Sequence, residues 1–121
     1  MPSRFAAKES VGYYATWTLG ARLAEPLNIS GWIFEATFER WAADPEAFTL
    51  EMAASDADQG FRIFNPVARQ ITCRILPATL AGISDTTGRF TMLADLLATP
   101  PGADRFFIAD LELTIVRGPT A

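Results

Sequence analysis

The sequence contains no histidine, a single cysteine (Cys73) and a single lysine among its ten basic residues. Without histidine the chain cannot build a serine–histidine or cysteine–histidine nucleophile, or a histidine-ligated zinc or haem site. One cysteine excludes an intrachain disulfide and a cysteine metal cluster. Lys+Arg is 10 against Asp+Glu 14, and the resulting net charge of -4 argues against nucleic acid as a partner. These absences remove much of the enzyme space, and we expect no histidine- or cysteine-bound cofactor and no nucleic-acid binding.

The composition is that of one folded domain. The chain has 121 residues, of which 50% are hydrophobic and 20% charged, a balance far from that of disordered chains. We predict an N-terminal arm at residues 1–10 and a single domain over residues 11–121. Charges or prolines interrupt every apolar run, so we expect no membrane span, and residues 11–18 are too polar for a secretion signal. Synthesis in the cytoplasm of the producing cell is the expectation.

Period-two alternation is the main structural signal. Trp32, Phe34 and Phe38 have one parity, and the residues of the other parity are Ile33, Glu35, Thr37 and Glu39, which places the aromatic side chains on one face of a strand. Cys73 lies on the same side of its strand as Ile71 and Ile75, so we expect a small buried hydrophobe rather than a reactive thiol. The predicted strands cover residues 11–18, 31–40, 48–54, 60–64, 69–75, 88–97 and 105–116.

Short strands separated by regular turn signals are typical of an all-β sandwich or barrel. The segment 88–97 would also suit a helix, but Gly88 and the Phe90–Thr91 pair favour a strand. The segment 77–83 has proline at a plausible first helical position, and we predict a single helical turn there.

Paired carboxylates are the remaining candidates for chemistry. Glu35 and Glu39 share a strand face, as do Asp110 and Glu112, and such pairs could flank a glycosidic bond. Acids at alternate positions are also the ordinary way to make the outer face of a strand soluble, and we favour that interpretation. Residues 56–60 partly match a calcium-binding loop but lack its third acid and its closing glutamate, so we interpret them as a turn.

Aromatic residues make up 12% of the chain, more than one small core can hold. Trp41, Phe64 and one of Phe106 or Phe107 have the wrong parity for the core or lie at strand ends. Such positions are often contact residues for another chain. Packing under loops is an equal alternative, and stacking on carbohydrate is a third.

Arginine supplies nine of the ten basic residues. This bias favours the residue that makes planar, bidentate contacts at protein interfaces, and Arg62 and Arg89 are candidates for such contacts together with Arg69 and Arg74. A genome rich in GC would produce the same bias without a physical reason, so both explanations stay open.

The order of these segments resembles the small immunoglobulin-like β-sandwich domains of tailed bacteriophages, including those at the N-terminus of baseplate upper proteins. Residues 14–18 form a tryptophan–threonine strand, and residues 26–32 (PLNISGW) resemble the family's P-L-D-L-[ST]-G turn. Residues 71–83 resemble its I-x-L-x-I-P-x-x-x-T-x-x-L segment, and 88–96 its G-x-Y-x-Y-D-L strand. The tail at 117–120 also ends in threonine, as in the family.

The resemblance implies an immunoglobulin-like antiparallel sandwich of about seven strands with one short helical turn. It implies no catalytic residues and a structural role in the virion, where the chain binds other virion proteins in a symmetric assembly of several copies. The expected position is the tail, baseplate or fibre-attachment region, with capsid decoration as the alternative. Trp41, Phe64, Phe106, Arg62 and Arg89 are the candidate interface residues.

A carbohydrate-binding module is the second hypothesis, from a different functional class. In it Tyr13, Trp17 or Trp41 would stack on sugar rings, beside a carboxylate pair such as Glu35 and Glu39. The sequence shows no polar pocket motif for it.

Overall fold

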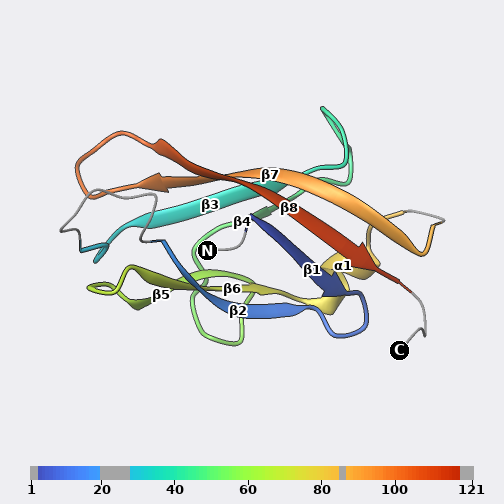
Figure 1. Ribbon diagram of the computed structural model, residues 1–121, viewed down its shortest axis with the longest axis horizontal. Helices are drawn as coiled ribbons and strands as arrows, with labels where there is room; N and C mark the ends of the chain where they lie inside the picture. Colours follow the sequence, from blue (N-terminus) through green and yellow to red (C-terminus); the bar gives the residue numbers. More distant parts are fainter. Residues whose placement is uncertain (1–2, 20–27, 85–86, 118–121) are drawn as a thin grey trace.

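The alternating segments of the sequence form strands that lie in two layers (Figure 1). The computed structural model describes residues 3–19, 28–84 and 87–117. Within these residues the elements are β1 (Arg4–Lys8), β2 (Tyr13–Thr18), β3 (Ile33–Phe38), β4 (Phe48–Leu50), β5 (Gly60–Asn65), β6 (Gln70–Ile75), α1 (Pro77–Ala81), β7 (Arg89–Thr99) and β8 (Phe106–Val116). One sheet has the strand order β1-β8-β7-β3-β4, and the sheet facing it has the order β2-β6-β5.

This strand order is that of an immunoglobulin domain. Named along the chain as A′, B, C, C′, D, E, F and G, the strands form an A′GFCC′ sheet and a BED sheet. Immunoglobulin domains place B, E and D on one sheet and C, F and G on the other, with C′ added in the variable type. The predicted all-β, immunoglobulin-like sandwich with one short helical turn is confirmed.

The arm predicted at residues 1–10 contains a strand that the sequence pattern did not predict. β1 pairs in parallel with β8, from Arg4–Glu112 to Lys8–Val116, so this edge departs from the antiparallel arrangement of the other pairs. Its five residues are too few for a clear alternation. Phe5 nevertheless packs against Trp17, with ring centroids 5.2 Å apart, because β1 borders the gap between the two sheets.

The segment 88–97, which would also have suited a helix, is strand β7 and continues to Thr99. The predicted helical turn is α1, which begins at Pro77. Among the residues that the structure describes, no helix has both the length and the apolar character needed to cross a membrane. Residues 26–27 of the predicted turn and residues 118–120 of the predicted tail lie outside the described part of the chain.

Strand β4 is shorter than the predicted 48–54. After Leu50 the chain leaves its partner β3, and Met52 forms a single parallel bridge with Phe61 of β5. The connection from β4 to β5 therefore passes from one sheet to the other at this edge of the sandwich.

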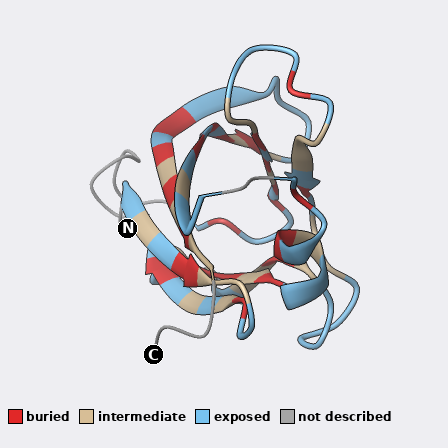
Figure 2. Ribbon diagram, turned by 90° about the vertical axis from the view of Figure 1, so that its right-hand side faces the viewer, coloured by how far each residue is buried: buried red, intermediate tan, exposed pale blue. Residues whose placement is uncertain are grey.

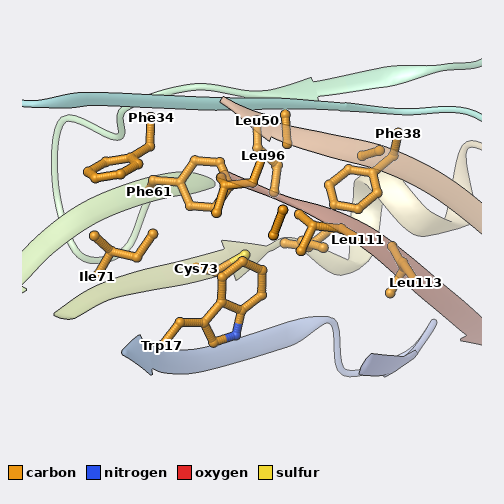
Figure 3. Close-up of a cluster of buried hydrophobic side chains, with 14 of the residues drawn as sticks. Trp17, Phe34, Phe38, Leu50, Phe61, Ile71, Cys73, Leu96, Leu111 and Leu113 are labelled. Atoms are coloured by element: carbon orange, nitrogen blue, oxygen red, sulfur yellow. The ribbon is translucent and has the colours of Figure 1, made fainter. Parts of the chain in front are cut away.

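Side chains from the inner faces of both sheets fill the space between them (Figure 3). Trp17 of β2 and Phe61 of β5 lie across from Phe34 and Phe38 of β3, and none of these four is more than 1% exposed. Buried and exposed positions alternate along the strands, as Figure 2 shows. Cys73 is buried in the same core, and burial raises the pKa of its thiol, so it has the expected hydrophobic role.

A β-bulge changes the parity of β8 near its start. The register between β7 and β8 shifts by one residue, and the adjacent Ile108 and Ala109 are both buried. Before the bulge Phe107 points outward and is 48% exposed. Phe106 is the cross-strand partner of buried Ala98 but begins the strand, so it is still 36% exposed, where simple alternation predicted only one exposed ring. Phe106 packs edge-on against Trp32, with ring centroids 5.7 Å apart.

We expect the core to dominate stability. Phe61→Ala should lower the free energy of unfolding by about 3–5 kcal/mol, because a fully buried phenyl ring leaves a cavity between the sheets. Thr16→Ala, at an exposed position of β2, should change it by no more than about 0.5 kcal/mol. Urea unfolding of both variants measures the difference, and equal effects would contradict this account of the core.

Candidate functional site

A groove lies on the outer face of the five-stranded sheet. The connection from β3 to β4 rises above this sheet in Figure 1, at the upper right, and forms one wall of the groove. The groove encloses about 640 Å³ and is open to solvent. Its lining includes Glu35, Glu39, Trp41, Leu93, Asp95 and Asp110.

The groove coincides with an interruption in the pairing of β3 with β7. The paired positions end at Glu35–Leu97 and resume at Glu39–Leu93, where both backbone hydrogen bonds are formed, at 3.0 and 2.9 Å. Between them Thr37 of β3 pairs with Thr49 of β4 and not with β7. The facing positions of β3 and β7 here are 54 residues apart at Glu39–Leu93 and 62 apart at Glu35–Leu97, so only the assembled sheet creates the groove.

Carboxylates dominate the charge of this face. Asp95 of β7 and Asp110 of β8 are direct cross-strand partners, an arrangement of like charges that is locally unfavourable. Arg105 reaches Glu35 at 3.3 Å, but within the described part of the chain no ion pair reaches Glu39, Asp95 or Asp110. Like charges at directly paired positions are unfavourable for a sheet, and such unfavourable local choices are expected mainly at functional sites.

A buried ion-pair network fixes the wall of the groove. The guanidinium of Arg40 donates to both carboxylate oxygens of Asp44, through Nε at 2.8 Å and Nη2 at 2.7 Å. Nη2 also lies 2.9 Å from Glu46, and Nη1 donates to the backbone oxygen of Ser84 at 2.6 Å. The side chains of Arg40 and Asp44 are 9% and 0% exposed. The network therefore ties the β3–β4 connection to the segment that follows α1.

Backbone groups complete the environment of Asp44. Its carboxylate accepts hydrogen bonds from the backbone N–H groups of Arg40 and Glu46, at 3.0 and 2.9 Å. Ala43 has a φ of 60°, a left-handed conformation that is unusual for alanine and that the tight turn requires. The side-chain hydrogen bond from Arg40 is the largest cause that lowers the pKa of Asp44 far below its ordinary value. Hydrogen bonds from Ser84 chiefly lower the pKa of Glu46.

The network also positions Trp41. The guanidinium of Arg40 lies over the indole ring, 4.3 Å from its centroid. This contact covers one face of the ring, while the side chain as a whole remains 56% exposed. A charged group held by Asp44 thus supports an aromatic residue at the edge of the groove.

The five candidate interface residues do not form one site. Trp41 lines the groove, and Arg89 lies at the start of β7 in the same sheet. Phe106 lies at the start of β8 against Trp32. Arg62 and Phe64 belong to β5, in the opposite sheet. The structure therefore distributes these residues over both layers of the sandwich.

The carbohydrate hypothesis is wrong for Trp17, which is buried, and Tyr13 is only partly accessible to a sugar. Trp17 is 1% exposed and its indole N–H donates to the Tyr13 hydroxyl at 2.9 Å, so it cannot stack on a sugar. Tyr13 is half-buried, and burial raises its pKa. Glu35, Glu39 and Trp41, by contrast, line the same groove, as that hypothesis requires of them.

The acids at residues 56–60 lie in a turn between β4 and β5. The carboxylate of Asp58 accepts a hydrogen bond from the hydroxyl of Ser55, at 3.0 Å. Among the described residues no group of three or more histidine, cysteine, aspartate or glutamate side chains could hold a metal ion.

Sequence reasoning missed Leu93, Asp95 and the ion pair of Arg40 with Asp44. An apolar residue at an outward position, such as Leu93, was the available signal on β7. The ion pair joins residues four apart in an irregular loop, for which alternation gives no prediction.

Comparison with protein-family models gives no match, and comparison with curated proteins gives none either. Comparison with solved structures gives similar chains, among them murine CRIg, with 8% sequence identity and a TM-score of 0.42 over 97% of this chain and 93% of that chain. A likeness this distant carries no inference about what the chain binds.

We expect Asp44→Asn to change the response to acid. A carboxylate with a lowered pKa stabilises the folded chain fully above the ordinary pKa of about 4, and this contribution is lost as pH falls further. The variant should be less stable at neutral pH, because buried Arg40 loses a charged partner, and its stability should fall less steeply below about pH 4. Urea unfolding at a series of pH values measures both effects.

The matched control is Glu51→Gln, at an exposed position after β4. It should keep the acid dependence of the parent protein. Equal acid slopes for Asp44→Asn and the parent would show that the network does not control stability in acid.

Proposed function

We propose that this protein is a non-enzymatic structural protein of a tailed-bacteriophage virion. It acts as an adaptor in the tail, baseplate or fibre-attachment region and binds other virion proteins. The support from the sequence is the resemblance over residues 14–18, 26–32, 71–83 and 88–96. The structure supplies the immunoglobulin-like sandwich that this resemblance implies. The protein is made in the host cytoplasm and ends in the virion.

The observation that supports partner binding best is the set of exposed apolar residues on the five-stranded sheet. Ile33 of β3, Leu93 of β7 and Phe107 of β8 point outward from this sheet, and Trp41 lines the groove together with Leu93. Each of the four is between 48% and 56% exposed. Exposed apolar residues gathered on one face and bordered by charges are typical of a surface that another protein covers.

The form of this face suits a rigid adaptor. Leu93 lies among Glu39, Asp95 and Glu112, so apolar contact would be surrounded by charges that select a partner of opposite sign. The wall that carries Trp41 is fixed by the buried Arg40 network before any partner arrives, which lowers the entropy lost on binding. Strands β1 and β4 leave two sheet edges at the sides of the same face for pairing with a partner strand.

Capsid decoration is the alternative location for the same function, since the same surface would serve there. The two locations differ only in which virion proteins cover the groove.

A carbohydrate-binding function is the second candidate, because Trp41, Glu35 and Glu39 line one groove. One ring face of Trp41 is covered by Arg40, which leaves the other for stacking. Retention of the monomer on immobilised polysaccharide, lost in a folded Trp41→Ala variant, would favour this candidate over the adaptor.

The adaptor function predicts that the chain is a stoichiometric component of the particle. Mass spectrometry of purified virions from the phage that encodes it should find the chain in a fixed number of several copies. Separated tails should contain it and separated heads should not, because the proposed partners are tail proteins. Its presence in heads alone would favour capsid decoration, and its absence from virions would overturn the proposal.

A further inference from the structure

The outer face of the three-stranded sheet is a second surface, on the opposite side of the sandwich from the groove (Figure 1). Tyr14 of β2 and Phe64 of β5 are 51% and 65% exposed. Arg74 of β6 is the cross-strand partner of Tyr14, and its guanidinium lies 4.1 Å from the centre of that ring. Arg62 of β5 lies beyond Arg74, paired with Thr72 on β6. We call this surface the arginine face.

The arginine face has the opposite charge from the groove. Its outward strand positions carry Arg62 and Arg74 and no carboxylate. Asp56 lies beside it in the preceding turn, where an exposed contact of 3.5 Å joins its carboxylate to Arg62. Across the molecule, the outward positions of β3, β7 and β8 carry the acids of the groove and its border: Glu35, Glu39, Asp95, Asp110 and Glu112.

We infer that the occupant of the groove is a second copy of this chain, which docks through its arginine face. The inference rests on the proposed function, since it specifies how several copies assemble. Arg62 and Arg74 of one copy would face Asp95 and Asp110 of the next, and this supplies the cations that those two acids lack within the chain. The exposed rings of the arginine face would meet the apolar residues of the groove.

Charge complementarity selects this head-to-tail arrangement over a two-fold dimer. Two grooves placed together would oppose acid to acid, and two arginine faces would oppose cation to cation. Only the joining of unlike faces brings opposite charges together. Because the two faces are different surfaces on opposite sides of the sandwich, each copy can bind one neighbour on each side, which builds a ring or a stack.

Sedimentation velocity of the purified full chain, over a wide range of concentration, tests the inference. We expect reversible association beyond the dimer that is at least about tenfold weaker in about 1 M salt than in about 0.1 M, because salt screens the charges. A protein that stays monomeric at every concentration, or whose association strengthens with salt, would overturn it.

Charge reversals locate the two surfaces. Asp110→Arg in the groove and Arg62→Glu on the arginine face should each weaken association by at least about tenfold. Each has a control with the same change of charge elsewhere: Glu51→Arg after β4, and Arg89→Glu in the five-stranded sheet. Neither control should weaken association, and all four positions are at least partly exposed, so thermal melts should confirm folding.

Mixing the two variants distinguishes unlike faces from like faces. Asp110→Arg keeps its arginine face and Arg62→Glu keeps its groove, so an equimolar mixture should form a mixed complex although each variant alone associates weakly. A two-fold dimer through either face alone would give no such complex, and that result would overturn the inference. Virion composition is a separate measurement: a chain that is present in virions but monomeric in solution would leave the proposed function standing without this assembly.

Discussion

The rest of the structure depends on the burial of two apolar sheet faces against each other. Trp17 and Phe61 from one sheet meet Phe34 and Phe38 from the other, and the strict alternation of strands then directs every second side chain outward. Each sheet therefore presents a separate outer face, and the two point in opposite directions. Because the core holds these faces apart, they can carry different charges without neutralising each other, as the groove and the arginine face do.

The second constraint is the buried contact between Arg40 and Asp44. A bidentate ion pair with almost no exposure is costly to assemble, and it is tolerated where hydrogen bonds satisfy both partners, as the backbone groups and Glu46 do here. Its consequence is a fixed loop with an exposed Trp41 at the edge of the groove. Stability of the loop and the shape of the candidate binding surface thus have one physical origin.

Much of the fold followed from the sequence because its signals are local. The alternation at residues 31–40 predicted β3, and Pro77 predicted where α1 begins. β1 was missed since five residues give no clear period, and the bulge beside Phe107 was missed because one inserted residue has no sequence signature. The groove could not be predicted, because it joins β3 to β7, and strand neighbours so distant in sequence are settled only by packing.

What the sequence by itself determined is the class of fold and the chemistry that the chain lacks. Alternation fixes which side chains are buried. A chain without histidine cannot form a histidine-based catalytic or metal site, whatever its fold. Only the tertiary structure decided which exposed residues lie together. It separated Trp41 from Phe64, although both had the wrong parity for the core, and it brought Asp95 beside Asp110. The physical reason is that burial is encoded along each strand, whereas a surface is made by the lateral order of strands.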